Sequence, residues 1–337
     1  MIKRISGVLL FLVMLQSALD LQSAAQLPPS CMANHLWYVD DGPIPVGWFF
    51  CSSYPGTFAS LICAMTCPPS PPCRNCKSPK ASQPISLATG ETYIEQTDIR
   101  IPGLGGGLSL QRTWTSTWPS SLPGLQTGMF GPNWRSTYEE KIVMGINNFL
   151  QYIRGDATFW SFGTRGSLVE WVATGPARSA VTLNTDTSSN PYFTLTFQDG
   201  EQHRFDKTTG NLVAIIDRNG NTTTVAYDSS GRLSTVTDAA SRSLTFNYTG
   251  NSSLASSVSS SVGISLSYSY DNQGRLTQVT KPDQTTVSFT YNSQSLITAV
   301  TDSNGKTLES HTYDSNGRGL SGSRANGVEA VTISYPH

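Results

Sequence analysis

Apolar and polar residues alternate along the second half of the chain. Three apolar residues stand two positions apart in segments such as Leu244, Phe246 and Tyr248, with polar residues between them. Because successive side chains of a strand point to opposite faces, this spacing puts the apolar trio on one face. Runs such as residues 228–231 and 302–305 begin with Asp and end with Gly, and these residues favour tight turns. The pattern predicts short strands joined by turns.

The strands recur with a nearly fixed period. An aromatic residue returns every 21 or 22 positions, at Phe205, Tyr227, Tyr248, Tyr270, Tyr291, Tyr313 and Tyr335. The next residue is an aspartate in four units, at Asp206, Asp228, Asp271 and Asp314. A glycine–arginine pair follows in three units, at Gly231 and Arg232, Gly274 and Arg275, and Gly317 and Arg318. A period of this length is typical of a repeat protein.

Each unit also contains two apolar residues three positions apart, such as Leu233 and Val236. A regular strand would place them on opposite faces, so we expect a bulge between them. A single unit is too small to bury its own apolar face, and neighbouring units must stack. We therefore expect one long antiparallel sheet that coils as it grows, because strands twist with a fixed hand.

These units resemble the Rhs/YD-repeat family, which is named for its Tyr-Asp units, and the resemblance covers Phe205 to the C-terminus. Residues 85–116, followed by Gly131 to Trp134, resemble the domain that leads into Rhs repeats. The resemblance and the patterning together predict an all-β fold. Its parts are a coiled antiparallel sheet of YD repeats, a β-rich lead-in domain and a small Cys-rich N-terminal module.

The resemblance also implies a role. Rhs-type repeats form hollow β shells that enclose a C-terminal toxin, which is released after self-cleavage. This chain carries about six units and stops at His337, as the next unit begins. We expect it to be a truncated N-terminal piece of such a shell, whose partner is a toxin segment or continuation missing from the chain.

The N-terminal residues predict export. Lys3 and Arg4 precede an apolar run from Val8 to Leu15, and small residues at 23–25 offer a cleavage site. Residues 1–25 are therefore predicted to be a signal peptide, and no membrane span is expected after its removal. We expect the protein to be secreted or to lie in the cell envelope (periplasm or surface). We expect a Cys/Pro-rich module at 26–80, the lead-in domain at 81–165 and the repeat array at 166–337.

All the cysteines lie in the predicted module. They are Cys31, Cys51, Cys63, Cys67, Cys73 and Cys76. An even number of cysteines in an exported chain favours disulfides, although the sequence does not choose among the fifteen possible pairings. The alternative is zinc, because Cys63 and Cys67, with Cys73 and Cys76, have ligand-like spacing.

No group of residues in the sequence predicts catalysis or a cofactor. His203 and His311 occupy the position two before the repeat aromatic, which favours packed histidines over catalytic bases. The repeat arginines should line up as a row that either pairs with the turn aspartates or engages acidic glycans. Five tryptophans fit a core or a cap for the first repeat better than a sugar-binding platform: Trp114, Trp118, Trp134, Trp160 and Trp171.

Composition narrows the classes of partner. Of the 337 residues only 13% are charged, the net charge is −1, and the basic residues are scattered. Nucleic-acid binding is therefore not expected. We expect a structural protein rather than an enzyme. The alternative is a surface module for adhesion that binds carbohydrate through its stacked tyrosine and arginine rows.

Overall fold

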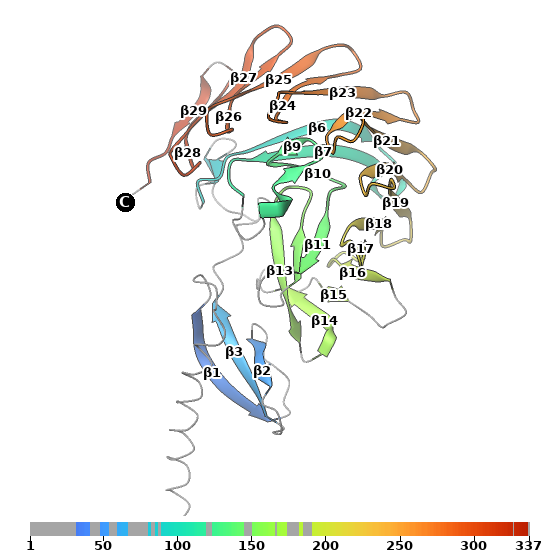
Figure 1. The fold of residues 1–337 in the computed structure, drawn as a ribbon, viewed down its shortest axis with the longest axis vertical. Helices are drawn as coiled ribbons and strands as arrows, with labels where there is room; N and C mark the ends of the chain where they lie inside the picture. The colour runs from blue at the N-terminus through green and yellow to red at the C-terminus, as the bar shows by residue number, and fades with distance from the viewer. Residues whose placement is uncertain are drawn as a thin grey trace, which may run out of the picture. The chain divides into compact units, whose positions relative to one another are not determined.

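The fold of the protein was analysed in a computed structural model (Figure 1), and nearly all of the described residues that form regular structure are in β-strands. They are 32–40, 48–53, 59–66, 80–81, 85–86, 89–118, 123–144, 150–165, 167–173, 182–184, 191–325 and 327–335. They fall into two units, one within residues 1–69 and the other within residues 70–337, and each is described by itself.

The first unit contains a three-stranded antiparallel sheet. Its strands are β1 (Met32–Asp40), β2 (Trp48–Ser53) and β3 (Ala59–Thr66), in the order β1-β3-β2. Cys51 lies in β2 and Cys63 in β3. The other four cysteines and the predicted signal peptide lie outside the described residues, so disulfide bonding, or zinc in its place, stays a prediction.

The second unit begins with the strands of the lead-in domain. Its main sheet contains β6 (Tyr93–Ile101), β7 (Leu108–Thr115) and β10 (Trp134–Ser136), in the order β10-β7-β6. The smaller elements are β4 (Lys80–Ala81) paired with β5 (Ile85–Ser86), β8 (Thr127–Gly128) paired with β9 (Gly131–Pro132), and the 3-10 turns η1 (Leu104–Gly106) and η2 (Pro123–Leu125).

The rest of the second unit is one antiparallel sheet of 19 strands, each paired with the next along the chain. The strands are β11 (Lys141–Met144), β12 (Leu150–Ile153), β13 (Phe159–Arg165), β14 (Ser167–Ala173), β15 (Thr182–Asn184), β16 (Tyr192–Thr196), β17 (Gln202–Asp206), β18 (Leu212–Ile216), β19 (Thr222–Tyr227), β20 (Leu233–Thr237), β21 (Ser243–Tyr248), β22 (Ala255–Ser260), β23 (Ser265–Tyr270), β24 (Leu276–Thr280), β25 (Thr286–Tyr291), β26 (Ile297–Asp302), β27 (Thr307–Tyr313), β28 (Gly319–Arg324) and β29 (Val328–Thr332). This sheet, which we call the ribbon, confirms the all-β fold with a coiled antiparallel sheet.

The ribbon is apolar on one face and polar on the other, as the alternation predicts. In β23, Leu266 and Tyr268 are buried, whereas Ser265, Ser267 and Ser269 are exposed. The polar face carries mainly Ser, Thr and Asn, and the apolar face supplies the core of the second unit. This one-sided burial is what lets short, weakly charged strands form a stable sheet.

The bulge expected between the two apolar residues of each unit is confirmed. Tyr227 lies opposite Leu233 and Ala226 opposite Thr235, so Ser234 is the extra residue. The bulge turns both Leu233 and Val236 toward the core. The same shift recurs where β17, β21, β23, β25 and β27 pair with the following strand.

The first coil of the ribbon closes on itself. The amide of Ile142 in β11 donates to the carbonyl oxygen of Gly210 at 2.8 Å, and the amide of Leu212 in β18 donates to that of Glu140 at 3.3 Å. These bonds join β11 to a strand seven places later in the sheet. The interior of the coil is filled by aromatic rings, and Tyr152 packs edge-to-face against Trp160 and Phe205.

Candidate functional site: the lead-in domain inside the ribbon

The lead-in domain packs against the apolar face of the ribbon. Figure 1 shows the later strands of the ribbon, β20 to β29, arching over β6 and β7. Three ring pairs join the two parts at centroid distances of 4.7 Å to 6.4 Å: Phe130 with Tyr268, Trp134 with Phe289, and Trp114 with Tyr313. Trp114, Trp134 and Trp160 are buried, which confirms the prediction of core or cap positions for these three residues.

A buried ion pair lies at the centre of this interface. Arg112 on β7 is only 1% exposed, and its Nε and Nη2 donate to the Asp98 carboxylate at 2.5 Å and 2.8 Å. The Tyr268 hydroxyl from the ribbon donates to the same carboxylate at 2.7 Å. The guanidinium also lies 4.8 Å from the centre of the Trp134 ring. Burial opposes the charge, but Asp98 outweighs it and raises the pKa of Arg112.

The repeat tyrosines tie neighbouring strands together. The Tyr227 hydroxyl donates to the carbonyl oxygen of Leu212, the first residue of β18, at 2.8 Å. Each later tyrosine reaches the first residue of the equivalent strand 15 or 16 positions earlier: Tyr248 to Leu233, Tyr270 to Ala255, Tyr291 to Leu276, Tyr313 to Ile297, and Tyr335 to Gly319. A regular antiparallel sheet does not require a hydrogen bond from a side-chain hydroxyl to a main-chain carbonyl of the neighbouring strand. This bond is therefore a particular feature of the repeat. We call it the tyrosine lock.

The aspartate and arginine form a second recurring interaction, in the three units that contain both. Asp228 accepts hydrogen bonds from the amides of Ser230 and Arg232 and from Arg232 Nε, at 2.8 Å to 2.9 Å. These bonds hold the pKa of Asp228 below its ordinary value. The guanidinium then lies over the Tyr248 ring of the next unit, 4.6 Å from its centre. Asp271 and Asp314 hold their arginines over the next tyrosine in the same way: Arg275 over Tyr291, and Arg318 over Tyr335.

The tyrosine, aspartate and arginine of the repeat signature thus interact across adjacent units, and the glycine allows the tight turn between them. Gly231, Gly274 and Gly317 have φ of 74° to 78°, which the turn requires. Asp206 departs from the pattern, since it accepts hydrogen bonds from Thr208 and Thr209 instead of an arginine. Because the described arginines of the row are paired with aspartates and cover tyrosine rings, the rows do not form an open platform. Glycan binding by the rows stays a prediction.

Both histidines of the repeat slot are buried, as predicted, but His203 has charged neighbours that the sequence did not indicate. Its Nδ1 lies 2.6 Å from Glu140 Oε2, and its Nε2 lies 3.0 Å from Glu201 Oε1. Burial lowers the pKa of His203, but the two carboxylates outweigh burial and raise it to about 9. His311 lies beside Glu309 at 3.5 Å.

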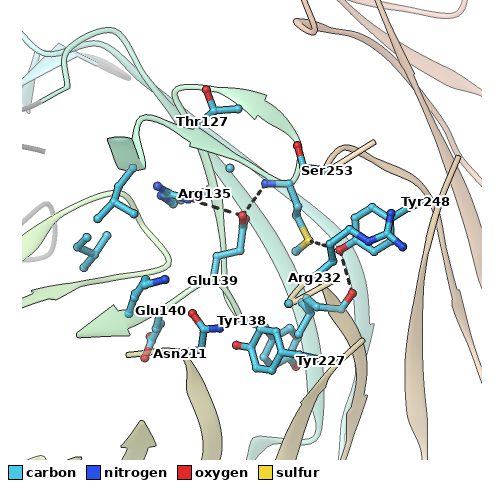
Figure 2. Close-up of a pocket in the computed structure, with 17 residues that line it drawn as sticks. Thr127, Arg135, Tyr138, Glu139, Glu140, Asn211, Tyr227, Arg232, Tyr248 and Ser253 are labelled. Atoms are coloured by element: carbon cyan, nitrogen blue, oxygen red, sulfur yellow. Dashed lines mark hydrogen bonds and ion pairs between the residues drawn. The ribbon is translucent and has the colours of Figure 1, made fainter. Parts of the chain in front are cut away.

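A pocket of about 260 Å³, lined by both apolar and charged side chains, lies where the lead-in domain meets the first repeats (Figure 2). On the lead-in side the Arg135 and Glu139 side chains point toward each other, and Arg232, Tyr227 and Tyr248 lie on the side of the repeats. Glu139 Oε1 accepts a hydrogen bond from the Met129 amide at 2.6 Å and lies 3.7 Å from Arg135 Nη1. Burial raises the pKa of Glu139, while burial and nearby Arg135 lower that of Lys141.

Among the residues that the structure describes, no three His, Cys, Asp or Glu side chains come together in a group that could hold a metal ion. No helix in the same residues is long and apolar enough to cross a membrane.

Comparison with known proteins identifies two matching family models. The model described as Teneurin YD-shell matches residues 202–322, and a domain of unknown function, DUF6531, matches residues 82–162. The first covers the ribbon from β17 into β28, where all the tyrosine locks except that of Tyr335 lie. The second covers the lead-in domain and the first strands of the ribbon.

Among curated proteins, the similar sequences are much longer than this one. The tRNA nuclease WapA of Bacillus subtilis (strain 168) is 30% identical over 149 residues, which are 44% of this chain and 6% of that protein. The tRNA(Glu)-specific nuclease WapA of Bacillus subtilis subsp. natto is 29% identical over the same length and shares. The chain therefore spans about 6% of the length of these relatives.

Solved structures show a weaker likeness. A TcdB2–TccC3 structure has a TM-score of 0.29 and 11% identity, covering 74% of this chain and 17% of that chain. The Photorhabdus luminescens Tc holotoxin pore has a TM-score of 0.27 and 11% identity, covering 67% and 14%. The YD-shell model matches the repeats whose tyrosine, aspartate and arginine side chains interlock, and this match confirms the predicted resemblance of residues 202–322 to the Rhs/YD-repeat family.

Proposed function

We propose that this chain is an exported structural scaffold, the N-terminal portion of an Rhs-type shell that encloses a toxin segment, and that it has no catalytic activity of its own. The observation that carries the proposal is the packing of the lead-in domain on the apolar face of the ribbon. Trp114, Phe130 and Trp134 of the lead-in domain pack against rings on that face in β27, β23 and β25. A shell needs such a cover where its ribbon begins, since the first coil has no preceding coil to pack against.

The signature residues support a structural role. In the three units with a glycine–arginine pair, the Asp and Arg side chains bind each other within the ribbon, and the repeat tyrosines bind carbonyls of the preceding strand. The WapA relatives are named as nucleases, but this chain matches only 6% of their length. We therefore assign any nuclease activity of such proteins to parts other than the ribbon, and the toxin segment is the partner that we propose.

Two measurements test the proposal. The purified 337-residue protein should leave a tRNA pool intact under conditions in which a control nuclease degrades it, and cleavage by the protein would contradict a scaffold without catalysis. Sequencing of the transcript beyond the codon for His337 should reveal further YD units and then a segment without repeats. An unrelated downstream gene would contradict the toxin-enclosing role.

A further inference from the structure

We propose that the pocket between the lead-in domain and the first repeats binds a small hydroxy-carboxylic acid about the size of one sugar ring. This site is independent of the scaffold function proposed above. Its walls come from both parts of the second unit, with Arg135, Glu139 and Lys141 on one side and Tyr227 and Arg232 on the other.

The first reason is a buried donor without an acceptor. Arg135 is 7% exposed, its Nε has no hydrogen-bond partner among the described residues, and its nearest carboxylate is Glu139, at 3.7 Å. Its guanidinium otherwise lies 5.0 Å from the centre of the Trp118 ring, and Lys141, which is half-buried, adds a second cation to the pocket. Buried charges in proteins are normally paired, since an unpaired one loses its hydration without compensation. A carboxylate offers the two oxygen acceptors that a guanidinium and an ammonium need.

The second reason is an acceptor left free in the same place. Glu139 Oε2 is buried without a hydrogen-bond partner in the described chain, while Oε1 is used by Met129. A ligand that brings only negative charge would leave Oε2 unsatisfied and repel it. A ligand that also carries hydroxyl groups donates to Oε2, so a hydroxy acid matches both the donors and the acceptor.

The size and rigidity of the pocket limit the ligand. About 260 Å³ is slightly below the usual range of small-molecule sites, roughly 300–1,000 Å³, and suits a single ring better than an oligosaccharide. Gly128 lies directly against the charged groups. A Cβ at this position would lie 2.9 Å from Glu139 Oε1 and 3.2 Å from Arg135 Nη1, so a larger residue would crowd them. The Tyr227 and Tyr248 hydroxyls are held by main-chain carbonyls, so the opposite wall is also fixed before a ligand arrives.

Calorimetric titration of the full chain with sodium glucuronate, and with glucose as the neutral match, tests the site. Glucuronate should bind saturably and glucose at least tenfold more weakly. Lys141→Gln should weaken glucuronate binding at least tenfold, because it removes a charge-assisted contact. The control Lys306→Gln changes an exposed lysine outside the pocket and should leave the affinity unchanged.

A second pair of variants separates binding from folding. Ser253→Trp places a bulky ring at an exposed turn position that lines the pocket, and it should abolish binding without lowering the melting temperature. Ser303→Trp, in an exposed turn elsewhere, should bind as the unaltered protein does. The proposal is overturned if glucuronate gives no saturable heat, if glucose binds equally well, or if Lys141→Gln and Ser253→Trp keep full affinity.

Discussion

The repeat tyrosine does two things with one side chain. Its ring contributes to the partly buried apolar face, and its hydroxyl donates to the main-chain carbonyl of the first residue of the preceding strand. Alternation along the strand predicted the first role, since the ring falls on the buried face. The second was not predictable, because it depends on a bond to a residue 15 or 16 positions away, and alternation does not specify that partner.

Tyr270→Phe removes the hydroxyl of one lock. The change keeps the ring but removes the bond to the Ala255 oxygen and a longer one, of 3.4 Å, to the Met129 oxygen, and we expect a loss of about 1–2 kcal/mol in the free energy of unfolding. Urea unfolding followed by tryptophan fluorescence measures it. Ser267→Ala, on the exposed face of the same strand, should change stability by less than about 0.5 kcal/mol. Equal effects of the two changes would mean that the lock contributes nothing.

His203 makes stability depend on pH. Its folded pKa of about 9 lies above the ordinary value of 6.5, so the folded protein holds this proton more tightly. The stabilisation is complete below about pH 6.5 and is lost as the pH rises through about 9. Its size is at most roughly 3 kcal/mol. Urea midpoints should therefore fall over this window, and His203→Gln should flatten the fall. Parallel profiles for the two proteins would contradict the assignment to His203.

At the scale of the element, the seam between β11 and β18 depends on close approach of two backbones. The main-chain bond from Ile142 to Gly210 leaves no room for a side chain, since a Cβ on Gly210 would lie 1.9 Å from the Ile142 oxygen. Gly210 occupies the position of the glycine that precedes arginine in later units. It closes a turn as they do, with its amide donating to the Asp206 carbonyl, and it also forms the seam.

Gly210→Ala and Gly231→Ala form a matched pair. Both glycines have φ between 71° and 75°, so alanine costs roughly 1–2 kcal/mol of backbone strain at either site. Gly231 has no atom within 4 Å of a Cβ, whereas Gly210 meets the Ile142 backbone. Chemical denaturation should show Gly210→Ala to be less stable by about 2 kcal/mol more. If the two variants lose the same stability, the seam does not constrain the fold.

The sequence indicated most of the element-scale structure. The spacing of Leu233 and Val236 predicted the bulge, and the Asp-x-x-Gly runs predicted the turns. The sequence of β7 also indicates a buried charge. Leu108, Leu110, Arg112 and Trp114 alternate, so Arg112 falls on the apolar face of β7, where a charge must have a buried partner.

At the scale of the whole molecule, the lead-in domain and the ribbon share one core. Contacts such as Tyr268 with Asp98, 170 residues apart, and His203 with Glu140, 63 residues apart, hold the two parts together. Local patterning does not reveal them, because it sets which face of a strand is buried and not which distant strand covers it. The pocket shares this origin, since its walls come from segments that meet only in the folded chain.

The Arg112–Asp98 pair tests this shared core. Arg112→Met leaves the Asp98 carboxylate buried without its cation, and we expect a loss of about 3–5 kcal/mol. Adding Asp98→Leu removes both charges and should restore much of that loss, since a buried pair often stabilises little more than apolar residues of similar size. Thermal and urea unfolding of both variants provide the comparison. A double variant no more stable than Arg112→Met would show that the cation does not act through Asp98.

The tyrosine lock has a consequence for how such chains change in length. Each tyrosine hydroxyl binds a carbonyl at a fixed sequence separation, and each guanidinium lies over the ring of the following unit. Gain or loss of a whole unit of 21 or 22 codons therefore keeps all these partners at the same separation. A deletion of one codon within a strand shifts all the inward side chains beyond the bulge to the solvent side. Duplication and loss of whole units are therefore the changes that this architecture accommodates.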